Sequence, residues 1–366
     1  MESLIELPLW YDLHAHFRQG DIMPSLVADH IKMGCAGILA MPNTKPPVAK
    51  VKKSDDGDSW SIEEYIDMLK TAGADAFDDI IAPLYLTAST TPQMIEAGAK
   101  SGLLRAAKYY PPHGTTGSEF GAPFAHYIEN GVFAAMADNN VVLNIHGEEH
   151  ALSGEAYFGR ETNAEEYFYK NRLPQAIDRF PGLKIVGEHV TTKIAVDVIK
   201  SAGSNVAATV TPQHLLYTTG HLVQGFKYHL FCLPLIKFED DRAALRAAVT
   251  DANNKKFFAG TDSAPHVKKV TPCGCAAGCY TGGIAPQLYA AAFEESGADP
   301  ASSAFRNFLS LNGPAFYGLK TATATFRLAK KESVIAPQDT PAGSVVPLPS
   351  GLTADGGNAR LSWALV

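Results

Sequence analysis

Short apolar runs recur along most of the chain, and each one ends in polar residues. Eight of these runs have the length of buried strands and are separated by stretches with helical periodicity. The runs span Leu7–His16, Gly37–Asn43, Ile80–Thr87, Leu103–Tyr110, Val141–His146, Lys184–His189, Val206–His214 and Lys256–Asp262. Strands that alternate with helices pair in parallel, so the pattern predicts an α/β protein.

Helix start signals fall between the predicted strands. Ser61 and Glu64 have the spacing of a capping box. Thr91 precedes a proline at the first helical position, and either Thr191 or Thr192 can begin a further helix. Eight strand–helix units indicate a closed (β/α)8 barrel of the TIM type, whose active site would lie at the carboxyl ends of the strands. The alternative is an open doubly wound sheet, but the sequence contains neither a G-x-G-x-x-G turn after the first strand nor a G-x-x-x-x-G-K-[ST] loop.

The chain length fits one domain. Barrels of this class run from about 200 to over 400 residues, and this chain has 366 residues. We therefore expect a single barrel domain over residues 1–366. The chain becomes rich in Pro, Gly and Ser after about Ala336. This composition predicts that residues 337–366 form an extended C-terminal tail packed on the barrel, ending in the strand-like segment LSWALV.

The charge balance and the cysteines exclude several classes of protein. The net charge is −7, whereas nucleic-acid binders usually carry a basic surface. No apolar run reaches the roughly 18 residues of a membrane-spanning helix, and Met1–Pro8 lacks the features of a signal peptide. The five cysteines are odd in number and partly clustered, which favours reduced thiols and a cytoplasmic location. We expect a small-molecule partner, and neither nucleic acid nor a membrane.

The stretch YDLHAHFRQGD contains candidate chemistry at the end of the first predicted strand. Side chains in a strand alternate between two faces, so His14, His16 and Arg18 are expected to share one face, with Leu13 and Ala15 on the other. Two imidazoles on one face can bind one metal ion. The alternative is a pair of hydrogen-bonded or solvated histidines without a metal.

The other polar strand ends extend this set. In a closed barrel they converge on one mouth. The residues are His14, His16, Asn43, Lys108, His146, His189, His214 and Asp262. Imidazole nitrogen and carboxylate oxygen suit zinc. Lys108 is the exception, since a buried ammonium is costly and cannot bind a cation. It either snorkels or pairs with an acid, or CO₂ has carbamylated it to give an anionic ligand able to bridge two metals, which the physics of the sequence alone does not show.

Other motifs are weaker. HGEEH places His146 and His150 four residues apart, but it is not H-E-x-x-H, and there is no G-x-S-x-G nucleophile elbow. Cys273, Cys275 and Cys279 could belong to a structural zinc knuckle, although no adjacent fourth ligand is evident.

Ten motifs, in order from residue 12 to about residue 319, resemble the dihydroorotase family in its shorter class II form, within the amidohydrolase superfamily. They are DLHAHFRQGD, MPNTKPP, AAKYYPPHGTT, NIHGE, EHVTTK, TPQHLL, FCLPLIK, GTDSAPH, CGCAAGC and LNGPAFYGL. GTDSAPH together with CGCAAGC is specific to this group, whereas H-x-H marks only the wider superfamily. The tyrosine-rich start of the loop after Lys108 and the VKKVTP stretch depart from the expected pattern, and neither contains a proposed ligand.

The resemblance implies a centre of two zinc ions. It assigns His14, His16 and Asp262 to the first zinc, His146 and His189 to the second, and N6-carboxylysine at Lys108 to the bridge between them. It assigns the substrate's α-carboxylate to Arg18, Asn43 and His266, and contacts with the substrate ring to the main chain of Leu233 and Ala276. It places Thr115 and Thr116 at the tip of a mobile loop and gives His146 a substrate contact as well. The cysteines of CGCAAGC then shape a loop.

The resemblance also implies an activity, which is the reversible cyclisation of N-carbamoyl-L-aspartate to L-dihydroorotate in de novo pyrimidine biosynthesis. A zinc-bridging hydroxide would attack, and Asp262 would act as general acid and base. Related proteins imply a homodimer. The alternatives are another cyclic amidase, such as a hydantoinase or allantoinase, and a catalytically inactive scaffold. The first would leave Arg18, Asn43 and His266 without a carboxylate to bind, and the second would be expected to have lost ligands, although none is missing.

Overall fold

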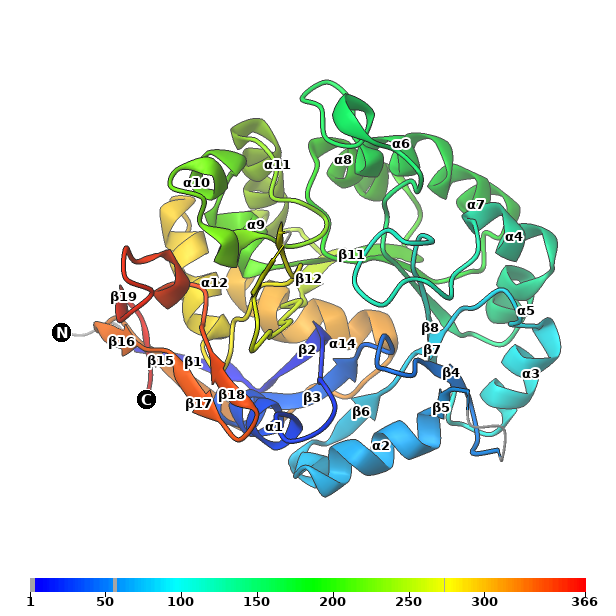
Figure 1. Cartoon of the computed structure of the whole chain (residues 1–366), viewed down its shortest axis with the longest axis horizontal. Coiled ribbons are helices and arrows are strands. Elements are labelled where there is room, and N and C mark those ends of the chain that lie inside the picture. Colours follow the sequence, from blue (N-terminus) through cyan, green and yellow to red (C-terminus); the bar gives the residue numbers. More distant parts are fainter. Residues whose placement is uncertain (1–3, 55–57, 273) are drawn as a thin grey trace.

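A barrel of parallel strands surrounded by helices forms the centre of the molecule (Figure 1). The computed structural model describes residues 4–54, 58–272 and 274–366. The barrel strands are β2 (Trp10–Ala15), β3 (Cys35–Ala40), β6 (Asp79–Ile81), β7 (Leu84–Tyr85), β8 (Ala106–Tyr109), β9 (Val142–Ile145), β10 (Ile185–Gly187), β11 (Val206–Val210) and β12 (Phe257–Ala259). The strands from β7 to β12 form one six-stranded sheet, and β2, β3 and β6 form a three-stranded sheet.

The two sheets close on each other at two seams. At one seam, β6 and β7 belong to the same run of chain and are separated by two residues. At the other, a parallel bridge joins Ala15 to Ser263, and the Asp262 amide donates a 2.8 Å hydrogen bond to the His14 carbonyl. The predicted (β/α)8 barrel is confirmed, and its third predicted strand is divided into β6 and β7.

The helices cover the outside of the barrel (Figure 1). They are α1 (Met23–Lys32), α2 (Ile62–Thr71), α3 (Pro92–Lys100), α4 (Phe124–Glu129), α5 (Val132–Asp138), α6 (Ala164–Asn171), α7 (Leu173–Arg179), α8 (Lys193–Ser201), α9 (Pro212–Leu216), α10 (Thr219–Val223), α11 (Glu239–Thr250), α12 (Ala285–Glu295), α13 (Ser303–Arg306) and α14 (Asn312–Tyr317). Single turns of 3-10 or π helix lie at Ala74–Ala76, Gly154–Ala156, Tyr228–Leu230, Asn307–Leu311 and Ser350–Leu352. None of the described helices is long and apolar enough to cross a membrane.

The predicted helix starts agree with the structure. Ser61 and Glu64 form a reciprocal capping box at α2. Thr91 caps α3 ahead of its first proline, and Thr192 caps α8. Each cap satisfies an amide that the first turn of a helix leaves without a partner. These local signals fix where each helix begins after its strand.

The predicted strand Val206–His214 is too long. β11 ends at Val210, and the Thr211 side chain accepts a hydrogen bond from the His214 amide, which caps α9. Proline at the first helical position then continues the helix. His214 therefore lies on a helix and not at a strand end.

The first predicted strand is also interrupted. β1 (Leu4–Pro8) lies outside the barrel and pairs in antiparallel fashion with β15 (Thr325–Ala329), and the barrel strand β2 begins only at Trp10. Within β2 the expected alternation holds for Tyr11 and Leu13, which share one apolar cluster, but it fails at Ala15, which packs in a different cluster. The register with β3 shifts between Asp12 and Ala15. Such an irregularity changes the face on which the following residues lie, so His14 reaches the site from a disturbed strand.

Apolar side chains fill the interior of the barrel at the end opposite the carboxyl ends of the strands. This inner cluster draws on most of the barrel strands and packs against Phe316 and Tyr317 of α14. Its members are Tyr11, Leu13, Ala36, Leu39, Met41, Ile81, Ala106, Val142, Val186, Ala207 and Phe258. A larger cluster fills the space between the strands and the helices. With one end of the barrel packed, the polar side chains collect at the carboxyl ends of the strands.

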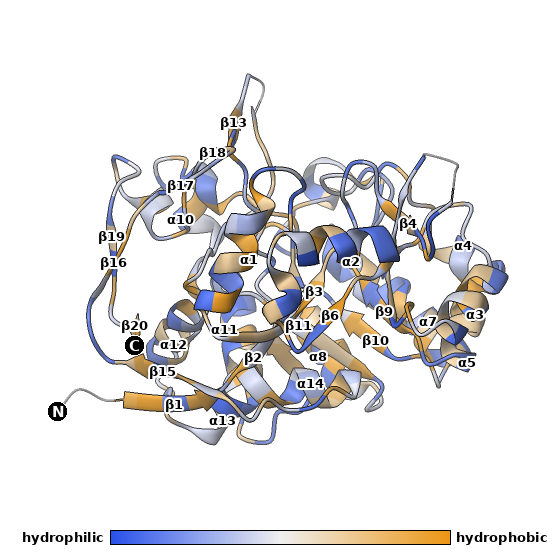
Figure 2. Ribbon diagram, turned by 90° about the horizontal axis from the view of Figure 1, so that it is seen from below, coloured by the Kyte–Doolittle hydropathy of each residue, from blue (hydrophilic) through white to orange (hydrophobic). Residues whose placement is uncertain are grey.

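Several small β elements lie outside the barrel. They are β4 (Val48–Lys50), β5 (Trp60–Ser61), β13 (Val270–Thr271), β14 (Gly274–Cys275), β16 (Ser333–Ile335), β17 (Gln338–Thr340), β18 (Gly343–Val345), β19 (Ala359–Leu361) and β20 (Ala364–Leu365). In Figure 2, β4, β13, β17 and β18 lie on one side of the molecule together with long connecting loops. The tail residues 337–366 thus contain short strands, and β20 joins β15 and β1 in one sheet.

Candidate active site

Polar side chains meet where the barrel strands end. Lys108 lies on β8, His146 directly follows β9, and His189 lies two residues beyond β10. Side chains that point into a barrel alternate along each strand. Two of the site residues lie just beyond a strand and have a backbone conformation that strands do not adopt. His189 and Asp262 have φ angles of 41° and 49°. This left-handed conformation is uncommon for residues other than glycine, and it redirects the chain at two points of the site.

A compact donor set holds one half of the site. The ligand atoms of His14, His16 and Asp262 all lie within 4.8 Å of one another. Nε2 of His16 is 3.0 Å from Oδ1 of Asp262, and Nε2 of His14 is 3.5 Å from the same oxygen. Two imidazoles and a carboxylate are a donor set that suits zinc. In the part of the chain that the structure describes, this is the one group of three or more His, Cys, Asp or Glu residues with such spacing.

The other predicted ligands lie beside this set. The ring centroid of His189 is 4.8 Å from that of His14 and 4.7 Å from that of His146. Nδ1 of His189 and Nζ of Lys108 are buried and have no hydrogen-bond partner in the structure. Buried polar atoms are rarely left unpaired, so these two atoms fit a site that holds a further group. Nε2 of His146 is 2.8 Å from Oε2 of Glu148.

Burial sets the protonation of these groups. It lowers the pKa of His14, His16 and His189 below the usual range, which favours the neutral imidazole that binds metals. It also lowers the pKa of Lys108 to about 8, although the Glu188 and Asp262 carboxylates oppose this change. The neutral amine of lysine is the form that reacts with CO₂, so the surroundings of Lys108 favour carbamylation.

Hydrogen bonds to Nδ1 orient two of the histidines. The Glu188 carboxylate lies 2.6 Å from Nδ1 of His14, and Oδ1 of Asn43 lies 2.8 Å from Nδ1 of His16. Each contact places the ring proton on Nδ1 and leaves Nε2 as the free donor atom. Glu188 also accepts hydrogen bonds from Thr209 and Asn144. The sequence analysis did not identify Glu188 or Asn144 as site residues, although Glu188 directly precedes His189 at a strand end.

A narrow pocket opens beside the donor set and contains most of the predicted substrate contacts. Its lining includes His14, His16, Arg18, Asn43, Thr115, Thr116, His146, His189, Leu233 and Asp262. A neighbouring cavity of about 250 Å³ shares Arg18, Asn43 and Thr116 with it and adds His266. Nε of Arg18 is buried without a partner. The three residues assigned to a carboxylate therefore all line this neighbouring cavity.

Ala276 is not among the residues that line the pocket. Ala277 and Gly278 line the pocket instead, and the Ala276 carbonyl accepts a hydrogen bond from Lys269. The hydrogen bond from Nε2 of His266 to the Ala277 carbonyl, at 2.8 Å, ties this segment to the cavity. The main-chain contact of Ala276 with the substrate ring stays a prediction, and its neighbour Ala277 is the residue that lines the pocket.

The loop at Thr115 and Thr116 is folded over the pocket. Nδ2 of Asn43 donates a 2.9 Å hydrogen bond to the Thr116 carbonyl. The Tyr85 hydroxyl donates to the Gly117 carbonyl at 3.1 Å. Within the loop, Ser118 bonds both the amide and the carbonyl of Thr115. Asn43 thus contacts a predicted ligand and the predicted loop tip at the same time.

His214 and the cysteines lie apart from the donor set. The ring nitrogens of His214 are 2.7 Å from the Thr211 hydroxyl and 3.2 Å from the Pro234 carbonyl. The thiols of Cys275 and Cys279 are directed at the carbonyls of residues 228 and 229, and Cys273 lies outside the described residues. The described cysteines belong to no metal-binding group with the spacing seen at His14.

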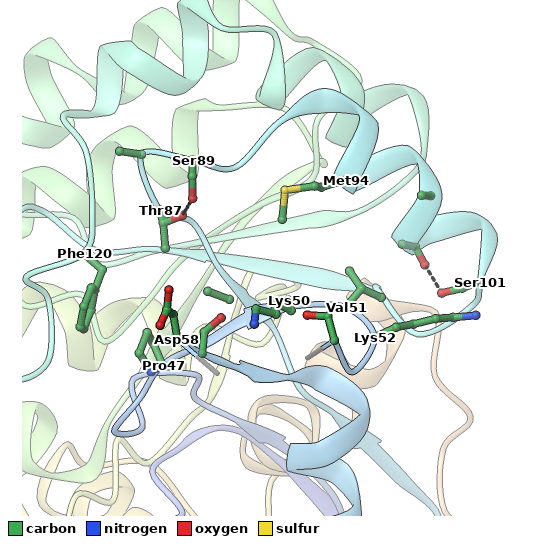
Figure 3. Close-up of a pocket in the computed structure, with 16 residues that line it drawn as sticks. Pro47, Lys50, Val51, Lys52, Asp58, Thr87, Ser89, Met94, Ser101 and Phe120 are labelled. Atoms are coloured by element: carbon green, nitrogen blue, oxygen red, sulfur yellow. Dashed lines mark hydrogen bonds between the residues drawn. The ribbon is translucent and has the colours of Figure 1, made fainter. Parts of the chain in front are cut away.

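A larger cavity, of about 940 Å³, lies between α3 and the segment around β4 (Figure 3). Lys50, Asp58, Thr87, Met94 and Phe120 are among its lining residues. No histidine or cysteine lines it within the described part of the chain. The candidate active site is therefore the narrow pocket and not this larger cavity, because His14, His16 and Asp262 line the narrow pocket.

Comparison with known proteins identifies the family. The chain is 41% identical over 346 residues to the dihydroorotase of Shewanella amazonensis, covering 93% of this chain and 94% of that protein. It is 40% identical over 360 residues to the dihydroorotase of Pseudomonas savastanoi pv. phaseolicola, covering 97% and 96%. The chain belongs to the dihydroorotase family. No protein-family model matches it.

Solved dihydroorotase structures have the same fold. The Saccharomyces cerevisiae enzyme, crystallised with 5-fluoroorotic acid, superposes with a TM-score of 0.85 at 28% identity, covering 99% of this chain and 98% of that one. The Campylobacter jejuni dihydroorotase gives a TM-score of 0.82 at 25% identity, covering 100% and 98%. Dihydropyrimidinase from Brevibacillus agri, at 12% identity and a TM-score of 0.72, covers 99% of this chain and 83% of its own and shares the barrel fold.

Proposed function

We propose that this member of the dihydroorotase family interconverts N-carbamoyl-L-aspartate and L-dihydroorotate in pyrimidine biosynthesis. The observation that carries the proposal is the position of Arg18, Asn43 and His266 around one cavity beside the His14, His16 and Asp262 donor set. A carboxylate-binding wall next to a metal-binding set fits a cyclic amide that carries a carboxylate.

The residues fit a metal centre. We assign His14, His16 and Asp262 to one zinc ion, His146 and His189 to a second, and carbamylated Lys108 to the bridge. The unpaired buried atoms of Lys108 and His189 support this assignment. When bound, the two ions polarise the attacked carbonyl and allow water to act as a nucleophile at neutral pH.

Asp262 is the proton carrier in this proposal. Its Oδ1 faces Nε2 of both His14 and His16, and its backbone is held by the bond from its amide to the His14 carbonyl. In hydrolysis of the ring, Asp262 accepts a proton from the attacking water and donates it to the departing amide nitrogen. Cyclisation reverses these two transfers.

The remaining residues bind and enclose the substrate. The guanidinium of Arg18 forms charge-assisted hydrogen bonds with the α-carboxylate, and Asn43 and His266 complete that contact. The main chain at Leu233 and at Ala276 or its pocket-lining neighbour Ala277 contacts the ring. The loop at Thr115 and Thr116 closes over the pocket and keeps water out during the reaction. His146 contributes to the substrate pocket as well as to the metal.

We further propose that residues 1–366 act as one domain, with residues 337–366 packed on the barrel, and that two chains form a cytoplasmic homodimer. The free thiols of Cys35, Cys232, Cys275 and Cys279 support a reducing compartment. Size-exclusion chromatography with light scattering would test the dimer, and a monomer at micromolar concentration would contradict it.

A substrate comparison tests the proposed specificity. Dihydrouracil has the ring of dihydroorotate but lacks its carboxylate, so it cannot use Arg18, Asn43 or His266. We expect kcat/KM to favour L-dihydroorotate over dihydrouracil by about 100-fold or more. Similar values for the two compounds would indicate a general cyclic amidase. Absence of turnover with both, in a zinc-loaded sample, would support an inactive scaffold.

A further inference from the structure

Lys269 belongs to the loop that follows β12, and its side chain is buried under the main chain of that loop. The residue is 7% exposed. Its Nζ donates hydrogen bonds to three main-chain carbonyls, those of Phe231 at 2.8 Å, Ala276 at 2.6 Å and Gly278 at 2.5 Å. An ammonium group has three donors, so every donor is used.

Burial of the Lys269 ammonium costs free energy that the exposed ammonium of Lys268 does not. Burying an ammonium is unfavourable unless the charge is paired or well hydrogen-bonded, and the three hydrogen-bond acceptors of Lys269 are neutral carbonyls and not carboxylates. The adjacent Lys268 is exposed. Charge-assisted hydrogen bonds to carbonyls are stronger and more directional than neutral ones. A buried charge at this point therefore controls main-chain geometry rather than packing.

The three carbonyls belong to two segments that form one wall of the pocket. The first segment contains Phe231 and leads to Leu233, and the second contains Ala277 and Gly278, which line the pocket with Leu233. The Gly278 amide also donates a 3.0 Å hydrogen bond to the Phe231 carbonyl. Lys269 and this bond hold the two segments together.

The same contacts position His266. Lys269 binds the carbonyls on both sides of Ala277, and the Ala277 carbonyl lies 2.8 Å from Nε2 of His266. A carbonyl can only accept, so this contact requires a proton on Nε2. The orientation and tautomer of His266 thus depend on a peptide group that Lys269 holds on either side.

We propose that Lys269 is a positioning residue for substrate recognition, whose ammonium fixes the Leu233 and Ala277–Gly278 wall and, through it, His266. The inference rests on the proposed function, because it assigns that wall to the ring and the carboxylate of dihydroorotate. Lys269 itself lies behind the wall and touches neither the substrate nor the metal donors. Its ammonium therefore acts on binding and not on the chemical step.

Lys269→Met tests this role, with Lys268→Met as the matched control. Contacts made equally in the ground state and the transition state change KM and leave kcat nearly unaltered. We expect Lys269→Met to raise the KM for L-dihydroorotate about tenfold or more, with kcat within about threefold of wild type and unchanged zinc content. Lys268→Met should match wild type. A folded Lys269→Met protein with the wild-type KM would overturn the inference.

A second variant covers the case in which Lys269→Met does not fold. Lys269→Ala leaves room for propylammonium, which replaces the missing part of the side chain with its charge. We expect propylammonium to lower the raised KM in a saturable way, while the neutral isostere propan-1-ol has no effect. If both compounds lower the KM equally, or if neither lowers it, the charge of Lys269 does not fix the position of the wall formed by Leu233 and Ala277–Gly278.

Hydrogen exchange separates this inference from the proposed function. The Gly278 amide should exchange faster in Lys269→Met than in wild type, and barrel amides such as that of Val186 should not. If the wild-type protein does not turn over L-dihydroorotate, the proposed function fails, whatever the exchange shows. If the wild type is active but Gly278 exchange and KM are unchanged in the variant, the role of Lys269 fails alone.

Discussion

The Glu188 carboxylate lies 2.6 Å from Nδ1 of His14, and both side chains are almost fully buried. This contact fixes the imidazole so that Nε2 faces Asp262. Partners of this kind typically change metal affinity 10- to 100-fold when removed. We expect Glu188→Gln to weaken zinc binding by about this factor, because the amide no longer provides the charged acceptor for the Nδ1 proton. Competition with a chelator of known affinity would measure it.

Glu165→Gln is the control for burying an amide in place of a carboxylate. Glu165 is as buried as Glu188, but it bonds Thr191 and Thr192. Both variants are expected to lower the thermal midpoint, whereas the loss of zinc affinity should be confined to Glu188→Gln. Equal zinc affinity in the two variants would remove Glu188 from the metal centre.

Arg18 is predicted to bind the substrate and not the metal. Arg18→Met removes the guanidinium while keeping an apolar stem of similar length. We expect KM for L-dihydroorotate to rise about 10- to 100-fold, the effect of losing charge-assisted hydrogen bonds, with zinc content unchanged. Arg105→Met, which breaks the pair with Asp79 outside the pocket, should leave KM as in wild type. A large loss of zinc in Arg18→Met would contradict the assignment.

Asp262 is predicted to be indispensable for proton transfer. Asp262→Asn keeps the shape of the side chain but cannot accept and return a proton. We expect kcat at saturating zinc to fall by about 10²- to 10⁴-fold. Circular dichroism should show a native spectrum, since the Asp262 amide still bonds the His14 carbonyl. Appreciable turnover in this variant would defeat the proposed role.

The Tyr85 hydroxyl is predicted to help hold the loop closed. Tyr85→Phe removes the hydrogen bond to the Gly117 carbonyl and keeps the ring contacts with Tyr110 and Phe120. Loss of about 1 kcal/mol should increase loop opening about fivefold, which amide exchange in residues 114–118 would detect. Tyr289→Phe, which loses a bond to Val210 far along the chain, should leave that exchange unchanged.

The sequence was a good guide to the parts of the fold that depend on local signals. Apolar runs located the barrel strands, and the caps at Ser61, Thr91 and Thr192 located three helix starts. Polar strand ends placed His14, His16, His146, His189 and Asp262 around one pocket, because the carboxyl ends of parallel strands share one edge. The positions of these strands and helix starts follow from hydrophobic periodicity and capping alone.

Other features depend on contacts between distant segments. The register shift that puts Ala15 on a different face from Leu13 arises from pairing with β3. His214 was misplaced because the Thr211–Pro212 cap was not recognised inside an apolar run. Glu188 gives no local signal of its contact with His14, which is 174 residues away. That Ala277 rather than Ala276 lines the pocket depends on how the loop is held by Lys269, and spacing cannot show that.

The most direct test measures L-dihydroorotate hydrolysis by the purified protein, with zinc content determined on the same sample. The proposed function predicts turnover in a sample that contains about two zinc ions per chain, and loss of activity when a chelator removes them. Turnover with this zinc content would establish the reaction and support the bridged centre. A zinc-loaded protein that leaves L-dihydroorotate unchanged would contradict the proposed activity.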